Sequence, residues 1–399
     1  MRDLIKLPTV NLINMWVYAI IFSILVRVAF WIFTIFYPLP NEAGIPISPI
    51  YPNSGIDLNF YLGHSLKYKE HIINLYNIFF SVSDNGSSVS KLNTPPTKLS
   101  ITPGPIFPII LLFTNFLYFP WILSFIYLLV SSYLVYISIQ WLNKNGISWL
   151  WLFLYGVLPV PFWFMINISP DLLFATVVTL FYFTISSENK LLYNKKSIIY
   201  LILLSILSIL LKPNGLSLLL FVFFILINSN FLANISKILI IIISVIIFIL
   251  FIDFYGNYLI SYIKSSNVHR TIFGYYQAEY FLGIYNFLPD YLNKFFSIFS
   301  LVVAKLLYLS GIRPSYGETL NFLVIIRSSA GLIIFPGLFW VFFKGSFKEK
   351  VFMVLFLLPI ILGLAQERYS LPIYPILFFY GILFYSYIFK NIYNIFKST

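Results

Sequence analysis

The chain has 399 residues, of which 60% are hydrophobic and only 10% are charged. Soluble globular chains carry about 25% charged residues, so this composition excludes an ordinary soluble protein. The absence of cysteine also excludes disulfides, thiolate nucleophiles and cysteine-based zinc or iron–sulfur sites. The composition therefore predicts an integral membrane protein.

The net charge of +12 raises the question of an acidic partner. No basic run is interleaved with aromatic residues, so we expect no nucleic-acid partner. The cations instead gather where apolar segments end, which is typical of loops that stay on the cytoplasmic side. They include Lys190, Lys195, Lys196, Lys344, Lys348, Lys350, Lys390 and Lys397. We expect membrane lipids around the protein.

The first apolar segment spans about residues 12–37. It is too long for the apolar core of a signal peptide, and no small-residue cleavage site follows it, so we expect a retained helix. A long polar region, 38–104, comes next and contains two amphipathic stretches at about 55–80 and 86–100. We predict a large external loop with helices lying on the membrane surface.

The remaining chain alternates between apolar segments and short polar breaks. Continuous apolar runs favour membrane-crossing helices over barrel strands, and a second mixed region at 255–292 is predicted to be external. We expect an all-α bundle of about 10–12 transmembrane helices, forming one catalytic module over 1–399 without a separate soluble domain. The predicted segments lie near 105–119, 121–141, 148–166, 170–186, 197–211, 213–228, 235–254, 293–312, 320–343, 349–364 and 370–389.

The orientation of these segments contains a conflict. An internal N-terminus puts 188–196 outside if all four segments between 105 and 186 cross the membrane, although this stretch is basic. One of the four is therefore predicted to be short or re-entrant. The most suitable interruptions are Pro120, Pro159 and Pro161, because proline breaks the helical hydrogen-bond ladder. No convincing internal repeat is present, which disfavours an inverted-repeat transporter.

The first candidate site residue is Asp57. If a helix begins near Ser54, Asp57, Tyr61 and His64 share one face. A carboxylate beside a phenol and an imidazole suits general-base chemistry on an acceptor hydroxyl. The structural alternative is that Ser54 and Asp57 form a capping box at the helix start.

Asp171 is a second candidate carboxylate. Ser169 has the character of an N-cap, Pro170 of a first helical residue and Asp171 of a first-turn acid. This structural interpretation accounts for all three residues. The functional alternative is that Asp171 helps to orient the acceptor.

Two cations could hold a phosphate leaving group. Lys212 interrupts an apolar stretch, and Arg368 lies between two others; arginine binds phosphate through two parallel hydrogen bonds. A snorkelling lysine and an internal pair of Arg368 with Glu367 are the structural alternatives. Arg27, inside the first helix, is expected to pair with a carboxylate of the bundle. The three histidines, His64, His71 and His269, are not spaced as metal ligands, so we expect no tightly bound metal or cofactor.

In order along the chain, these motifs resemble the GT-C superfamily of polytopic glycosyltransferases, which use polyprenyl- or dolichyl-phosphate sugars. The resemblance is to its mannosyltransferases and aminoarabinose transferase. It covers almost the whole chain through short motifs: Leu25-Val-Arg-Val28, Asp57-Leu-Asn-Phe-Tyr61, Thr102-Pro-Gly-Pro-Ile-Phe-Pro108, Ser169-Pro-Asp171, Leu211-Lys-Pro-Asn-Gly215 and Glu367-Arg-Tyr-Ser-Leu-Pro-Ile-Tyr-Pro375.

The resemblance implies a transferase with an outward-facing site. Asp57 would be the general base of an inverting reaction, Tyr61, His64 and Asp171 would bind acceptor, and Arg368, Lys212 and Tyr369 would bind the donor phosphate. The donor would be a polyprenyl-phosphate sugar and the acceptor a glycan, lipid or protein, in a bacterial inner or plasma membrane rather than the endoplasmic reticulum. The alternatives are a flippase or transporter of polysaccharides or lipid-linked oligosaccharides, and a glycan polymerase.

Overall fold

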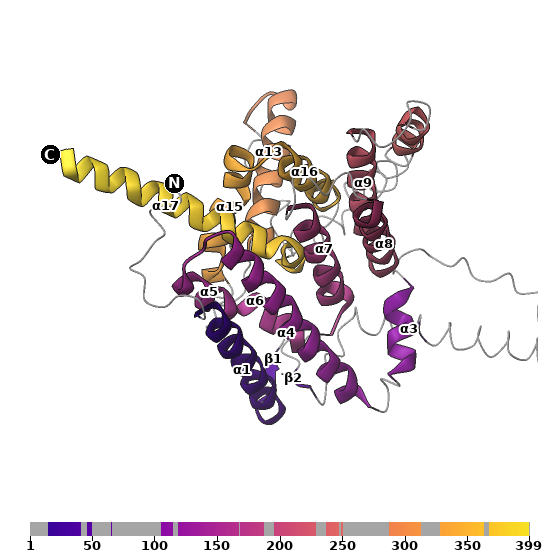
Figure 1. Ribbon diagram of the computed structural model, residues 1–399. Coiled ribbons are helices and arrows are strands. Elements are labelled where there is room, and N and C mark those ends of the chain that lie inside the picture. The colour runs from indigo at the N-terminus through magenta and orange to yellow at the C-terminus, as the bar shows by residue number, and fades with distance from the viewer. Residues whose placement is uncertain are drawn as a thin grey trace, which may run out of the picture.

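The computed structural model is a bundle of helices (Figure 1). It describes residues 15–40, 46–49, 65, 105–114, 119–166, 168–186, 195–228, 237–246, 249, 287–312, 328–362 and 367–398. The helices, with two short 3-10 helices labelled η, are α1 (Met15–Phe36), α3 (Ile106–Phe113), α4 (Pro120–Lys144), α5 (Trp149–Gly156), α6 (Pro159–Ile166), α7 (Pro170–Ser186), α8 (Lys195–Leu211), η5 (Pro213–Gly215), α9 (Leu216–Asn228), α13 (Asp290–Leu309), α15 (Gly331–Lys344), α16 (Phe347–Leu362), η6 (Glu367–Ile373) and α17 (Tyr374–Ser398).

Among the described residues, three helical stretches are long and apolar enough to cross a membrane: Met15–Phe36, Pro120–Lys144 and Tyr369–Asn394. Large hydrophobic side chains cover their outer faces, such as Leu25 at 61% exposure and Leu129 at 54%. Contiguous apolar surface of this kind is unusual for a protein in water. The described chain is therefore a helical protein with segments suited to membrane insertion.

Several other helices are short. α3, α5 and α6 have eight residues each, which gives about 12 Å of helix against ~30 Å of hydrocarbon. Pro120 opens α4 and Pro159 opens α6, because proline is tolerated in a first helical turn. The predicted short element between 105 and 186 could therefore be α3, α5 or α6.

Helices α1 and α4 pack in opposite directions through paired polar side chains. Arg27 Nε donates to Ser131 Oγ at 3.1 Å, and Trp31 Nε1 donates to Ser124 Oγ at 2.9 Å. Higher residue numbers on α1 thus meet lower numbers on α4. In hydrocarbon, such hydrogen bonds fix the register of two helices that have no hydrophobic driving force to associate.

Helices α15 and α17 cross at two glycines. A side chain on Gly337 would overlap the backbone of α17, with the Leu377 carbonyl carbon at 2.8 Å and Gly381 N at 2.9 Å from its Cβ. A Cβ on Gly381 would lie 2.8 Å from Ile333 Cγ2. Glycine is therefore required on both helices, because only glycine permits this approach of the two backbones.

One feature departs from the predicted all-helical fold. β1 (Leu39–Pro40) and β2 (Pro46–Ile47) form an antiparallel pair just after α1. Each strand has two residues, far fewer than the 9–11 that a membrane-crossing strand needs. The pair leaves the helical architecture unchanged.

Candidate functional site

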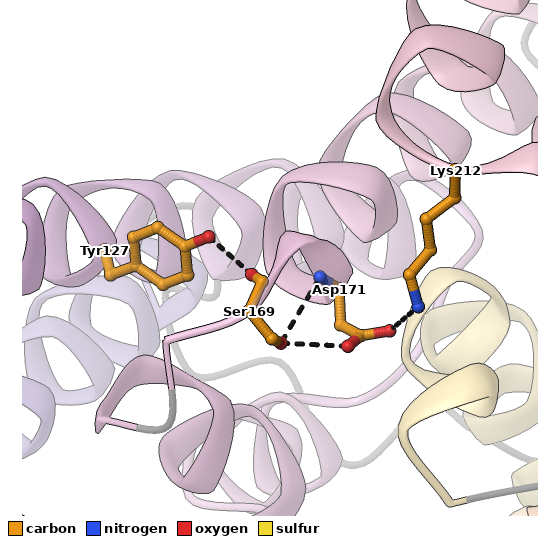
Figure 2. Close-up of polar contacts among 4 residues, drawn as sticks. All are labelled: Tyr127, Ser169, Asp171 and Lys212. Atoms are coloured by element: carbon orange, nitrogen blue, oxygen red, sulfur yellow. Dashed lines mark hydrogen bonds and ion pairs between the residues drawn. The ribbon is translucent and has the colours of Figure 1, made fainter. Parts of the chain in front are cut away.

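A buried ion pair joins the start of α7 to the end of α8. Lys212 Nζ bonds Asp171 Oδ1 (Figure 2), and the two residues are 9% and 2% exposed. Asp171 lies in the first turn of α7, whereas Lys212 directly follows α8. Because α7 and α8 are consecutive and pack together, they bring two charges that are 41 residues apart in sequence to one end of the bundle.

Ser169 caps α7 and holds the other oxygen of the same carboxylate. Its hydroxyl donates to Asp171 Oδ2 at 2.8 Å and accepts from Asp171 N at 3.4 Å. The predicted roles of Ser169 as N-cap, Pro170 as first helical residue and Asp171 as first-turn acid are confirmed. The positive end of the helix dipole adds further stabilisation of the carboxylate.

Tyr127 extends this network into α4. Its hydroxyl donates to the Ser169 carbonyl oxygen (Figure 2), and its side chain is fully buried. The contact fixes the backbone position from which the Ser169 hydroxyl reaches Asp171. Nothing in the sequence distinguishes Tyr127 from any other interior tyrosine, because it stands in an apolar run.

On its other side, Lys212 faces the segment that contains the predicted arginine. Lys212 Nζ lies 4.7 Å from the ring centre of Tyr369, within the range of a cation–π contact. Tyr369 belongs to η6, and Thr179 Oγ1 of α7 donates to the Pro372 carbonyl oxygen at 3.1 Å. The backbone of Arg368 is therefore next to Tyr369 at this site.

An apolar pocket of about 410 Å³ lies between α3, α4, α7 and α8, and neither Asp171 nor Lys212 is among the residues that line it. Its lining includes Leu173, two residues after Asp171, and Leu211, the residue before Lys212. Leu129 at 54% exposure and Leu207 at 37% open it toward the outer surface of α4 and α8. The complete lining is Ile106, Ile110, Leu129, Val130, Tyr133, Leu173, Thr176, Val177, Leu207 and Leu211.

This arrangement sets what the site can do chemically. Removing two charges from water is costly, so the close pairing of Asp171 and Lys212 is what allows both to be buried. An ammonium group has three donors and a carboxylate accepts at two oxygens. Lys212 can therefore bond Asp171 and still offer N–H groups to an anion.

The predicted site residues have three different outcomes. Asp171, Lys212 and Tyr369 lie together, although Asp171 was predicted to bind the acceptor and the other two the donor phosphate. Arg368 is placed by its backbone alone. Asp57, Tyr61 and His64 lie outside the described residues, as do most of 38–104 and 255–292, so their roles stay predictions. Among the residues that the structure describes, no cluster of three His, Asp or Glu side chains could hold a metal ion.

The expectation for Arg27 is wrong in one respect. It is fully buried, but its partners in the described part of the chain are neutral: Ser131, the Ser23 carbonyl at 3.1 Å and the Gly156 carbonyl at 2.7 Å. The guanidinium also lies 4.5 Å from the ring centre of Phe162. Carbonyl dipoles and a π face thus replace the expected carboxylate, and Arg27 ties α1 to α4, α5 and α6.

Comparison with known proteins adds no relative. No protein-family model matches the sequence, and no curated protein or solved structure matches it.

Proposed function

We propose that the protein is a membrane glycosyltransferase that moves a sugar from a polyprenyl-phosphate donor to a hydroxyl acceptor. The observation that carries this proposal is the position of Lys212, a buried cation that lies against Tyr369 and directly follows Leu211, a residue of the apolar pocket. A ligand that complements both features has an anionic head and a long hydrocarbon tail. The family resemblance assigns Arg368, whose backbone adjoins Tyr369, to the same phosphate as a second cation.

In the proposed reaction, the acceptor hydroxyl attacks the anomeric carbon and gives its proton to Asp57. A carbon–oxygen bond forms on one face of the sugar while the bond to the donor phosphate breaks on the other, so the configuration inverts. The bonding electrons stay with the polyprenyl phosphate. Lys212 and Arg368 stabilise this growing negative charge, and Asp171 holds Lys212 in place.

The membrane arrangement is part of the same proposal. We infer about 10–12 transmembrane helices, with 38–104 and 255–292 outside and the site open to the outer side of a bacterial plasma membrane. The lipid donor then enters from the bilayer through the pocket between α4 and α8. The acceptor, a glycan, lipid or protein, approaches from the aqueous side.

The direct test incubates the purified protein with a panel of polyprenyl-phosphate sugars and candidate acceptors, followed by mass measurement. We expect one sugar to be added to an acceptor and free polyprenyl phosphate to appear in equal amount. Binding of the lipid without release of its phosphate, across the whole panel, would contradict a transferase.

Replacing the proposed base should separate catalysis from folding. In Asp57→Asn, the neutral amide cannot take the proton of the acceptor, so we expect transfer to fall by at least about 100-fold while donor binding persists. His71→Gln is the matched control and should remain active. Full activity of Asp57→Asn would remove Asp57 from the mechanism, and failure of externally added reagent to label Asp57→Cys would place it on the wrong side.

A bulkier side chain in the pocket should weaken the binding of long-tailed donors more than that of short-tailed donors. Val177→Phe adds bulk to a lining residue that is only 7% exposed, so we expect KM for a long-chain donor to rise about tenfold, as for the loss of one or two buried methylene groups. KM for a donor with one or two isoprene units should change less than twofold. Leu154→Phe, on the outer face of α5, is the control. Equal effects on both donors would mean that the tail lies elsewhere.

A flippase or polymerase of lipid-linked sugars would also need a cation beside an apolar pocket. The two alternatives predict different products. A flippase moves the lipid between leaflets of a vesicle without cleaving it, whereas a polymerase extends a glycan from a lipid-linked chain. Following radiolabelled donor in vesicles, with and without acceptor, distinguishes transfer from both.

A further inference from the structure

The opposite end of α7 leads to a second polar region. Tyr182 is eleven residues beyond Asp171, about 16 Å along the helix, and its hydroxyl donates to Glu349 Oε1 at 2.5 Å. Glu349 Oε2 accepts from Ser346 N and Ser346 Oγ, both at 2.7 Å. These bonds turn the Glu349 carboxylate toward α7 and the start of α16.

The remaining charges of this region are positive. Glu349 is the only acidic residue in the sequences of α15, α16 and α17, whereas Lys344, Lys348, Lys350 and Lys390 belong to the same helices. Lys344 and Lys390 are exposed. The Glu349 carboxylate is hydrogen-bonded to Tyr182 and Ser346. Because the lysines outnumber it, the surface formed by these helices has a net positive potential.

Two aromatic rings lie close to Lys344, one of the two exposed lysines. Lys344 Nζ lies 5.8 Å from the ring centre of Trp340 and 5.9 Å from that of Tyr387. Lys390 follows Tyr387 by three positions on α17, so its side chain emerges from the same face. We call Trp340, Lys344, Tyr387 and Lys390 the basic aromatic patch; it joins the end of α15 to the part of α17 that extends toward the C-terminus (Figure 1).

Hydrophobic side chains next to the patch face outward. Phe343 is 73% exposed and Phe389 is 63% exposed. An amphiphile could place its hydrocarbon chains against these rings and its head against the lysines. Tryptophan and tyrosine are enriched at the level of the lipid headgroups in membrane proteins. Their presence in the patch favours a lipid over a soluble anion as its ligand.

We propose that the basic aromatic patch binds the phosphate headgroup of an anionic phospholipid on the side of the membrane opposite the ion pair. Lys344 and Lys390 bond the phosphate oxygens, while Trp340 and Tyr387 position the ammonium groups at headgroup depth. This proposal is independent of the glycosyltransferase proposal, because it uses residues at the other end of the helices.

The test reconstitutes the full chain in nanodiscs of phosphatidylcholine containing a minority of phosphatidylglycerol. Native mass spectrometry then counts the lipids retained when the disc is stripped. We expect phosphatidylglycerol to be retained preferentially, and this preference to fall about 25-fold in K344Q/K390Q, since each lysine near an anionic surface contributes a roughly fivefold gain. K144Q, at the exposed end of α4, is the matched control and should stay within twofold.

Three results would overturn the proposal. The first is equal retention of both lipids by the unmodified protein. The second is an equal loss in K144Q, which would mean diffuse electrostatics rather than this patch. The third is displacement of phosphatidylglycerol by millimolar inorganic phosphate, which would mean a site for free anions. Because the exchanged lysines are exposed, helix content by circular dichroism should not change, and raising salt to about 0.5 M should weaken retention by the unmodified protein alone.

Discussion

Asp171→Asn should destabilise the protein by about 3–5 kcal/mol, the largest effect that we expect of any single side chain in the site. The substitution keeps the shape of the side chain and one acceptor oxygen, so Ser169 can still bond it. It removes the charge that balances Lys212, which is 9% exposed. An unpaired ammonium in such surroundings must be dehydrated without compensation. Unfolding in mixed micelles, followed by circular dichroism, measures the loss.

A double substitution provides the control. Lys212→Met in the Asp171→Asn background removes the second charge and retains much of its volume, so most of the lost stability should return, as it does when buried pairs are replaced by neutral residues. The coupling energy of the two positions should then be several times the ~0.5 kcal/mol seen for independent sites. Additive losses would mean that the two charges do not depend on each other. Transfer activity should not return with stability in the double variant, because the donor phosphate has lost one of its two proposed cations, Lys212.

Gly337→Ala should also destabilise the protein, although alanine has a higher intrinsic helix propensity than glycine. Alanine favours a helix over glycine by about 1 kcal/mol. In this helix, however, the new Cβ would meet backbone atoms of α17, including Gly381 N at 2.9 Å. Backbone cannot rotate aside as a side chain can, so the helices must separate, at a cost of about 1–3 kcal/mol. A lower free energy of unfolding would therefore show that the close packing of α15 on α17 outweighs helix propensity, and a higher one would show the reverse.

Leu332→Ala is the control for this experiment. Leu332 is on the same helix but 63% exposed, so its side chain makes few contacts within the bundle. We expect a change below about 0.5 kcal/mol. Stabilisation by Gly337→Ala would show that α15 and α17 do not cross as closely as described. Because the chain has no cysteine, a cysteine pair introduced at the crossing can report the separation of the two helices independently.

The parts of the fold that sequence predicted best are those set by local chemistry. The start of α7 is an example, since Ser169, Pro170 and Asp171 each have a residue-specific reason to occupy the positions that they take. The end of α8 at Leu211 matches the predicted segment because Pro213 follows it. Both boundaries depend on neighbours within one helical turn.

The contacts that define the candidate site depend on tertiary packing instead. Sequence identified Asp171 and Lys212 separately, as acceptor and phosphate ligands, because nothing local indicates that α7 and α8 bring them together. The apolar pocket required the arrangement of four helices. A subtler signal was available for α4, where Ser124, Ser131 and Ser138 recur every seven residues and are all buried. That spacing marks one polar face, which two of these serines use to meet Trp31 and Arg27 of α1.

The ion pair between α7 and α8 also bears on how the chain enters the membrane. An aspartate or a lysine that reaches hydrocarbon alone costs about 2.5–3.5 kcal/mol on the insertion scale, whereas a neutralised pair costs less. Asp171 and Lys212 lie near the same end of two successive helices, so they can meet only when the hairpin closes. The translocation machinery is therefore expected to release α7 and α8 into lipid as one unit, and ribosome stalling before residue 212 should leave α7 loosely inserted.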